Sequence, residues 1–358
     1  MNHLHGFLTT SLLVLAGTAA LAEAPPVAAP IVPGRMNADR LRWLEYTMVA
    51  GRIAITSDNV GTNMTYGPTR STSGRRERLV IQIHPGQIDL HYELATPEGS
   101  FSVVASSGNK ASNVAVADRF VLKLAYEGLS LDFAQQPGEP LAVEFETGGV
   151  KRRLVAPSFW HLYLADPEAM RAYLLPALEV LHPSWQLGPT GAALEETLLA
   201  RAAAGVAIGT ARWARQVEDL ASSEFTKRAA AQRELFSAGQ VILPYLQALD
   251  RRKLDAEQNA RVRSLIDSLT PGYQDSTERL SVWLAGDAQI WLALLARGEV
   301  AKRRLAARQL SMLQGAAIDF DPEADPATRE QQWQRLRDRI IRDEPADPVS
   351  VPPPNAQR

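Results

Sequence analysis

Two periodicities divide the chain. Between residues 78 and 156, apolar and polar side chains alternate with a period of two, which is typical of antiparallel strands with one buried and one solvated face. From Pro157 onward, apolar side chains recur at helical spacing instead. The sequence therefore predicts an α+β protein, with an antiparallel β domain at residues 36–156 followed by an all-helical domain at residues 157–342.

Turn residues and matching faces fix the register of four hairpins. Because a slip of one residue would turn each apolar set to the wrong face, the pattern specifies one pairing. The expected partners are Leu79, Ile81 and Ile83 with Tyr92, Leu90 and Ile88; Leu90, Tyr92 and Leu94 with Ala105, Val103 and Phe101; Leu122, Leu124 and Tyr126 with Phe133, Leu131 and Leu129; and Val143 and Phe145 with Leu154 and Arg152.

The last hairpin, which turns at Gly148-Gly149, also matches on its solvent face. Glu146 would lie opposite Lys151 and Glu144 opposite Arg153, and such opposite charges stabilise neighbouring strands. We expect seven or eight strands in a meander that packs as a sandwich or bends into a strongly curved sheet.

The segments around these hairpins carry weaker patterns. A short helix is expected at Ala38–Met48 and a strand at Val49–Thr56. Two polar segments, Asn59–Arg78 and Ser106–Asn113, are expected to be long loops.

Helix starts are marked in the C-terminal half. After an aromatic cluster at Ser158–Ala165, Asp166-Pro167 supplies an N-cap and a proline at the first helical position, and this helix would end near Leu181. Further helices are expected at Thr190–Ala204 and at Ala327–Ile341. The last carries a thin apolar stripe of Trp333, Leu336 and Ile340.

The clearest internal signal is a segment that occurs twice. The matching positions, each 75 residues apart, are Glu224, Phe225, Lys227, Arg228, Ala231, Leu235 and Ala238 in the first copy and Glu299, Val300, Lys302, Arg303, Ala306, Leu310 and Leu313 in the second. Both copies contain an apolar stripe, which would extend to Ile242 in the first and to Ala317 in the second. The acid and the arginine four positions apart would form ion pairs. Gly239 could end the first helix, and Pro244 could open the next.

A weaker third copy spans Asp255–Leu269, with Glu257 and Arg261 at the same spacing. The glutamates at 224, 257 and 299 are 33 and 42 positions apart, which resembles HEAT-like repeats of about 40–47 residues. The resemblance covers about residues 222–315 and implies an α-solenoid whose surface binds other proteins. The alternative is an irregular helical bundle in which the similarity is coincidental.

The first 22 residues have the features of an export signal. Leu12–Ala16 is the apolar centre, and Ala20-Leu21-Ala22 is a small-x-small cleavage site. The apolar run is shorter than the roughly 20 residues that a membrane-spanning helix needs. Residues 23–34 and 343–358 are rich in proline and are expected to be a disordered linker and a disordered tail.

Composition narrows the classes of function. The formal charge is -2, and residues 36–156 hold 13 basic and 13 acidic side chains. The sequence therefore lacks the excess of basic side chains that is typical of nucleic-acid-binding proteins. The chain has no cysteine, which excludes disulfides and thiolate chemistry. The mature length of about 330 residues fits two domains of ordinary globular composition.

Few residues suggest chemistry. Asp89, His91 and Glu93 share a strand face near His84, which is a possible metal set, although solvated side chains are the simpler interpretation. His161 and His182 have neither a G-x-S-x-G motif nor a cysteine nearby and are interpreted as packing or surface histidines.

Two further stretches contain residues that could bind an anion or carry a glycan. An anion-binding loop or, more simply, a solvated loop is expected at Arg70, Arg75, Arg76 and Arg78, and Asn63-Met64-Thr65 matches a glycosylation sequon. We predict no catalytic, cofactor-binding or metal-binding residue, and no cofactor.

Taken together, the features resemble uncharacterised exported bacterial proteins with HEAT-like repeats. This resemblance implies a periplasmic or secreted, non-catalytic scaffold or adaptor that binds other envelope or secreted proteins. The alternative is a small-ligand or glycan binder, or a hydrolase, that uses the loops Asn59–Arg78 and Ser106–Asn113.

Overall fold

The computed structural model describes most of the chain between residues 41 and 342. The described residues are 41, 44–57, 64–66, 69–72, 74–84, 87–107, 119–126, 128–137, 139–205, 210–249, 251–270 and 272–342. The expected export signal (1–22), linker (23–34), tail (343–358) and sequon asparagine Asn63 lie outside these residues.

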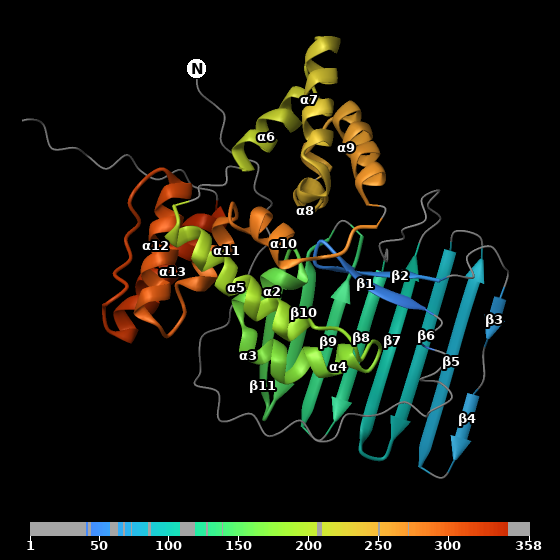
Figure 1. Ribbon diagram of the computed structural model, residues 1–358. Helices are drawn as coiled ribbons and strands as arrows, with labels where there is room; N and C mark the ends of the chain where they lie inside the picture. Colours follow the sequence, from blue (N-terminus) through green and yellow to red (C-terminus); the bar gives the residue numbers. More distant parts are fainter. Residues whose placement is uncertain are drawn as a thin grey trace, which may run out of the picture.

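The N-terminal part contains one open antiparallel sheet (Figure 1). Its strand order is β11-β10-β9-β8-β7-β6-β5-β3, and β4 also pairs with β5. The strands are β3 (Met64–Tyr66), β4 (Thr69–Thr72), β5 (Arg75–His84), β6 (Gln87–Thr96), β7 (Gly99–Ser107), β8 (Arg119–Tyr126), β9 (Leu129–Gln135), β10 (Leu141–Thr147) and β11 (Val150–Ala156).

Every predicted register in this sheet is confirmed, from the pairing of Leu79 with Tyr92 to that of Phe145 with Arg152. The solvent-facing residues of the last hairpin are in the expected register, but the ion pair runs diagonally, because Lys151 Nζ lies 2.6 Å from Glu144 Oε1. Alternation of apolar and polar side chains therefore specified the pairing of these strands.

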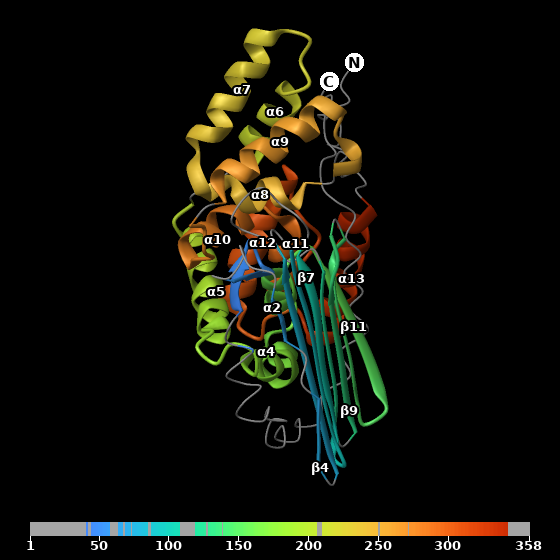
Figure 2. The ribbon, with the colours of Figure 1, turned by 90° about the vertical axis from the view of Figure 1, so that its right-hand side faces the viewer.

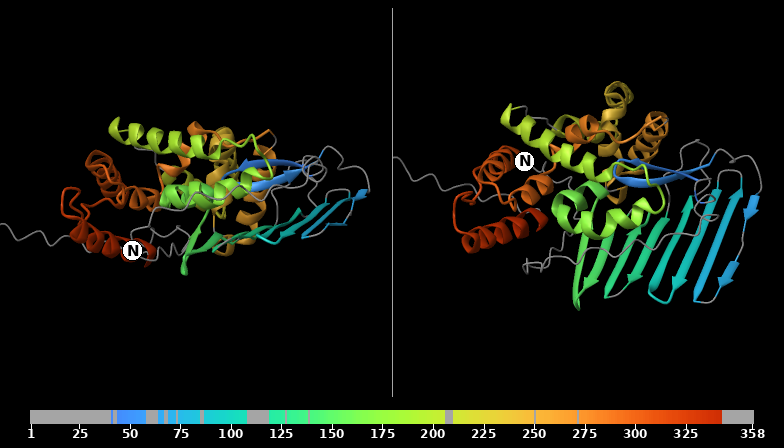
Figure 3. Two further views of the ribbon diagram at one scale, coloured as in Figure 1. Left: turned by 90° about the horizontal axis from the view of Figure 1, so that it is seen from below. Right: turned by 60° about the horizontal axis from the view of Figure 1, so that its bottom comes forward.

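The layering of the sheet differs from the predicted sandwich. A short hairpin, β1 (Glu45–Val49) and β2 (Arg52–Thr56), and the first helices of the C-terminal half cover the inner face of the large sheet (Figure 3). In the described residues no second large sheet packs on it.

Three local predictions around the sheet were right only in part, and the strand expected at Val49–Thr56 is confirmed at Arg52–Thr56. The helix expected at Ala38–Met48 gives way to β1 from Glu45, since Tyr46 and Met48 alternate with polar residues and are buried on one face. The strand expected at Val49–Thr56 is interrupted by a turn at Ala50-Gly51. The loop expected at Asn59–Arg78 contains β3, β4 and the start of β5.

From Phe159 onward the described chain contains helices only, as predicted. They are α2 (Phe159–Ala165), α3 (Pro167–Ala169), the π-helical turn η1 (Met170–Leu174), α4 (Leu175–Glu179), α5 (Leu187–Ala203), α6 (Thr210–Asp219), α7 (Phe225–Ser237), the short turn η2 (Gly239–Ile242), α8 (Leu243–Ala248), the turn η3 (Arg251–Lys253), α9 (Ala256–Leu269), α10 (Thr277–Leu284), α11 (Ala288–Leu294), α12 (Val300–Gln314) and α13 (Pro326–Arg342).

The residues predicted to start, cap or end helices lie at the expected positions. Asp166 caps α3 by accepting the Ala169 N–H at 3.0 Å, and Pro244 lies in the first turn of α8. Gly239 follows α7 with a φ of 68°. Asp325 precedes α13, where its side chain accepts the N–H groups of Ala327 and Thr328.

Two apolar cores hold the molecule together. The larger core joins the inner face of the sheet to α2–α5 and α10–α13, so it continues across the change from strands to helices near residue 157. The smaller core lies within α6–α9 and includes Leu235, Leu243 and Val262. Figure 2 shows α6–α9 as a group beyond one end of the strands.

The β1–β2 hairpin joins the two cores. Ile53 and Ile55 belong to the larger core, whereas Val49 and Ala54 belong to the smaller one. The Gln135 side chain of β9 accepts the Ile53 N–H at 2.9 Å and donates to the Ile53 carbonyl at 3.0 Å. The hairpin is therefore fixed to the sheet on one side and to the helices on the other.

The duplicated segment forms α7 and α12. Of its predicted stripe, Ala231, Leu235, Ala306 and Leu310 are buried. The stripe residues Ala238 and Leu313 are half-buried, and Ala317 is exposed, because α12 ends at Gln314.

The ion pairs expected at the start of these helices were wrong. Arg228 donates to the carbonyls of Ser222 and Ser223, and Arg303 donates to the corresponding carbonyls of Arg297 and Gly298. Each arginine thus closes the connection that precedes its own helix. The acid four positions earlier is the N-cap residue in both cases, with a φ of -83° and a ψ of 120° at Glu224 and a φ of -81° and a ψ of 123° at Glu299.

The connections that lead into the two helices also correspond. The Ala221 N–H donates to Glu218, and the Ala296 N–H donates to Ala293, at 3.0 and 3.2 Å. The next residues, Ser222 and Arg297, repeat the same three-residue bond at 3.1 and 3.2 Å. In contrast, Glu257 of the weaker third copy lies inside the first turn of α9, where Asp255 is the cap, and its predicted pairing with Arg261 is confirmed at 2.6 Å.

Candidate functional site: the groove between α7 and α9

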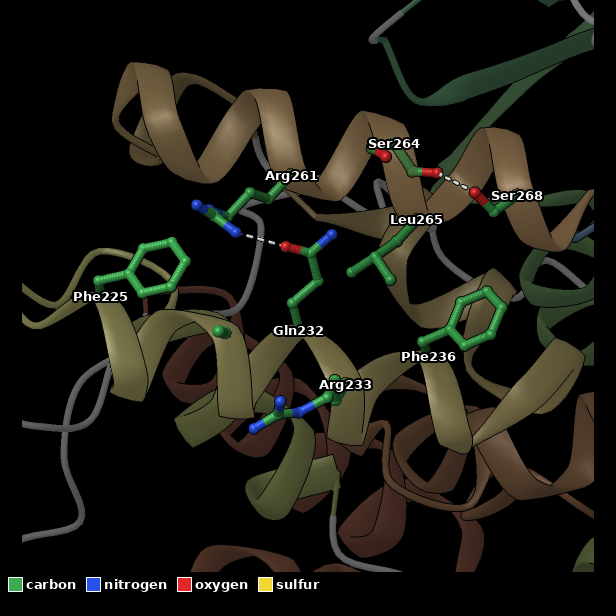
Figure 4. A pocket seen from close by; sticks show the side chains of 9 residues that line it. Phe225, Gln232, Arg233, Phe236, Arg261, Ser264, Leu265 and Ser268 are labelled. Atoms are coloured by element: carbon green, nitrogen blue, oxygen red, sulfur yellow. Dashed lines mark hydrogen bonds between the residues drawn. The ribbon is translucent and has the colours of Figure 1, made fainter.

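An open groove of about 480 Å³ runs between α7 and α9 (Figure 4). It is lined by Phe225, Ala229, Gln232, Arg233 and Phe236 of α7 and by Arg261, Ser264, Leu265 and Ser268 of α9. The α7 residues recur at intervals of three and four, so they occupy one helical face, and the buried stripe of α7 occupies another.

Two aromatic side chains mark the ends of the groove. Phe225 is 68% exposed and Phe236 is 54% exposed, although large apolar side chains are usually buried. Their separation of eleven positions corresponds to about 16 Å along the helix axis. Leu265, which is only 2% exposed, lies between them on α9.

The middle of the groove is polar and positively charged. Arg261 donates to the Gln232 side chain and, through Nε, to Glu257 at 2.7 Å. Arg233 is exposed and forms no ion pair or hydrogen bond with the residues that the structure describes. The lining contains two arginines and no carboxylate. Because Glu257 neutralises Arg261, the exposed Arg233 supplies the net positive charge, which favours a partner that carries negative charge.

Arg228 lies at the Phe225 end. Its guanidinium carbon is 5.8 Å from the centre of the Phe225 ring. Its Nε is buried without a hydrogen-bond partner, since the nearest carboxylate oxygen, on Glu257, is 3.9 Å away. A buried donor without a partner costs about 1–3 kcal/mol, but this atom is covered and Arg228 does not line the groove.

The sequence contained a signal for this groove that the predictions did not use. Phe225 and Phe236 lie on the same face of the predicted helix, away from its small-residue stripe. The position of α9 beside that face could not be predicted, because it depends on the turn through η2 and α8.

A second cluster has the composition of a hydrolase triad. Ser158 Oγ lies 2.8 Å from His161 Nδ1, and His161 Nε2 lies 3.1 Å from Asp287 Oδ2. A hydroxyl therefore lies beside His161 although the sequence has no G-x-S-x-G motif there. Asp287 could not be connected to His161 from the sequence, since it lies on a different helix.

This cluster is enclosed. Ser158 is 1% exposed and His161 is 3% exposed. The Ser158 hydroxyl caps α2 by accepting the His161 N–H, and Asp287 caps α11 through the Gln289 N–H. Gly51 packs so closely that a Cβ there would lie 2.8 Å from Ser158 Oγ. These side chains fix two helix starts against each other, and Ser158 and His161 are almost completely covered by the described residues.

The other residues singled out from the sequence lie apart from the groove. His91 Nε2 lies 3.0 Å from Glu93 Oε1, and Asp89 accepts from Gln87. Among the described residues no three histidine or acidic side chains gather as metal ligands. Arg75, Arg76 and Arg78 lie on strand β5, Arg70 lies on β4, and His182 stacks on Trp185.

Comparison with models of protein families, with curated proteins and with solved structures found no significant match. Within the part of the chain that the structure describes, no helix has the length and apolar character needed to span a membrane.

Proposed function

We propose that this protein is an exported scaffold or adaptor that binds other proteins through the helical hairpins of its C-terminal half. The α7–α9 groove is its binding surface. The observation that carries the proposal is the pair of exposed phenylalanines, Phe225 and Phe236, at the two ends of a groove between helices. Exposed aromatic anchors at the ends of a concave helical surface are typical of protein-binding sites.

The duplicated hairpins support the scaffold proposal. In α6–α7 and in α11–α12, the helix connection, the cap conformation and the arginine that closes the connection all correspond. Burial corresponds as well: Val217 and Leu220 are buried like Leu292 and Leu295. We infer that the two hairpins are copies of one HEAT-like unit, a unit whose stacked helices commonly form binding surfaces.

The proposed location outside the cytoplasm rests on the first 22 residues, with their apolar centre and small-x-small cleavage site. Intact mass measurement of the native protein should give an N-terminus at Glu23, or at Pro25 if cleavage follows Ala24. Recovery of the full-length chain from the cytosol would contradict export.

The groove is tested by photo-crosslinking in the cells that produce the protein. A photoreactive residue at Ser264, which lines the groove, should give one covalent adduct of defined mass. The same residue at Asp267, which is exposed on α9 but does not line the groove, is the matched control. The adduct should disappear when Phe225 and Phe236 are both changed to serine.

Equal adducts from positions 264 and 267, or an adduct that persists without the two phenylalanines, would show that the groove does not select a partner. Circular dichroism of each variant would establish that the helices remain folded.

A further inference from the structure

In the hairpin α11–α12, a later segment of the same chain packs beside α12, the helix that corresponds to α7. α12 ends at Gly315, which has a φ of 67°, and the chain then returns toward the start of α12. Arg303 Nε donates to the Pro322 carbonyl at 2.9 Å, and Arg304 pairs with Glu323. The returning segment is therefore held by two arginines of the first turns of α12.

The sequence of this segment alternates apolar and acidic residues. It reads Ile318-Asp319-Phe320-Asp321-Pro322-Glu323. Ile318 and Phe320 pack against the larger core, while the acidic side chains remain at the surface. The segment thus combines apolar anchors with negative charge in a non-helical chain that turns at Ile318–Phe320 and at Asp321–Ala324.

In the hairpin α6–α7, the corresponding helix α7 has different neighbours. The arginine equivalent to Arg303 is Arg228, and its Nε has no hydrogen-bond partner. The position equivalent to Arg304 is Ala229, which lines the groove. One turn further, Arg233 supplies an exposed cation. After α7 the chain continues through η2 and α8 into α9, so a helix that forms the other wall of the groove, and no acidic segment of the described chain, lies beside this face.

We propose that the groove binds a non-helical acidic segment of a partner protein, with apolar side chains between its carboxylates. This inference rests on the proposed function and names the class of partner. The segment runs antiparallel to α7, as residues 318–323 run along α12. One carboxylate pairs with Arg233, and apolar side chains contact Phe236 and Leu265.

The probe is a fluorescent peptide with the sequence of residues 316–325, Ala-Ala-Ile-Asp-Phe-Asp-Pro-Glu-Ala-Asp. Its binding to the full chain is measured by fluorescence anisotropy, against a control peptide in which asparagine and glutamine replace the acids. The acidic peptide should bind at least about tenfold more tightly than the neutral one, and added salt should reduce this difference.

The chain offers a matched pair of variants. Arg233→Glu should weaken binding of the acidic peptide at least about tenfold. Arg308→Glu, at the equivalent exposed position of α12, should leave the affinity unchanged. Phe236→Ala should weaken both peptides, since aromatic anchors contribute much of the affinity at such surfaces.

Equal affinity for the two peptides, or equal effects of Arg233→Glu and Arg308→Glu, would overturn the inference. If the crosslink at position 264 identifies a partner but the acidic peptide shows no preference, the groove remains the binding surface and only the acidic class of partner fails. If position 264 gives no selective adduct, while the peptide binds through Arg233, the class stands and the cellular scaffold role fails.

Discussion

At the scale of single residues, the turn between β1 and β2 is the most constrained position in the fold. Ala50 and Gly51 have φ values of 52° and 69°, the two positive angles of a tight hairpin turn. A Cβ at Gly51 would lie 2.7 Å from Ser158 Cβ and 2.8 Å from Trp160 Cδ1. Space and conformation therefore both require glycine at position 51.

Gly51→Ala should lower the free energy of unfolding by about 1–3 kcal/mol, since the added methyl overpacks a buried site. Ala50→Gly should change it by less than about 1 kcal/mol, because relief of the left-handed strain offsets the entropy that glycine loses. Urea unfolding of the two neighbouring variants checks this contrast. A wild-type midpoint for Gly51→Ala would contradict it.

The same turn is held by a carboxylate. Asp275 accepts the Ala50 N–H at 2.6 Å, the Gly51 N–H at 2.7 Å and the Trp160 indole N–H at 2.6 Å. Loss of hydration raises the pKa of Asp275 from 3.8 to about 6, although these hydrogen bonds act in the opposite direction. Asp275 thus connects the segment between α9 and α10 to the hairpin and to α2.

The raised pKa gives a pH dependence of defined sign. The folded state binds the Asp275 proton more tightly than the unfolded state, so this group stabilises the fold at pH 4 and loses that contribution as the pH rises through about 6. Asp275→Asn should destabilise the protein at every pH, because the amide nitrogen would face N–H donors. The difference in unfolding free energy between wild type and variant should grow from pH 7 to pH 4. A constant difference across this range would contradict the shifted pKa.

At the scale of elements, an arginine in the first turn of a helix organises the chain before it. Arg303 is 3% exposed and donates to the carbonyls of Arg297, Gly298 and Pro322. Arg329 in the first turns of α13 similarly donates to the Ala324 carbonyl. A guanidinium suits this role because its donors are arranged in a rigid planar fork.

Arg303→Ala should cost about 2–4 kcal/mol, since it leaves several buried carbonyls without a donor. Arg228→Ala should cost about 1 kcal/mol, because its carbonyl partners are nearer the surface. Arg303→Lys should recover little, as an ammonium cannot reach three carbonyls in different directions. Chemical denaturation of the three variants measures how much unfolding free energy each one loses and so tests this ranking. Equal effects of the two alanine substitutions would exclude a special role for Arg303.

The sequence predicted the elements better than their contacts. Alternation from Leu79 to Leu154 determined the registers of the four predicted hairpins, because only one pairing placed the apolar set on one face. The partners of Arg228 and Arg303 were missed, since backbone carbonyls leave no mark in a sequence. The groove could not be predicted without the position of α9, and the enclosed His161 cluster could not be predicted without the contact between α2 and α11. Both depend on the tertiary structure.

At the scale of the whole molecule, the inner face of the sheet explains why a sandwich was predicted. Residues such as Phe101, Leu122 and Phe133 are completely buried, and the same pattern would arise under a second sheet or under helices. The covering layer here consists of helices and the β1–β2 hairpin, and the hairpin contributes residues both to the larger core and to the smaller core of α6–α9. The groove belongs to α6–α9, which share the smaller core.

This division predicts two responses to the loss of a buried leucine. Leu235 lies in the smaller core, and Leu310, at the equivalent position of α12, lies in the larger one; both are 0% exposed. Leu235→Ala and Leu310→Ala should each cost about 2–5 kcal/mol locally. Amide hydrogen exchange should nevertheless rise only in α6–α9 for the first, and in both the sheet and α10–α13 for the second, because each core opens as its own unit. Leu336→Ala should resemble Leu310→Ala, since Leu336 is 2% exposed in the same core. If Leu235→Ala accelerates exchange throughout the sheet, the two cores unfold as one, and the groove cannot adjust to a partner independently of the sheet.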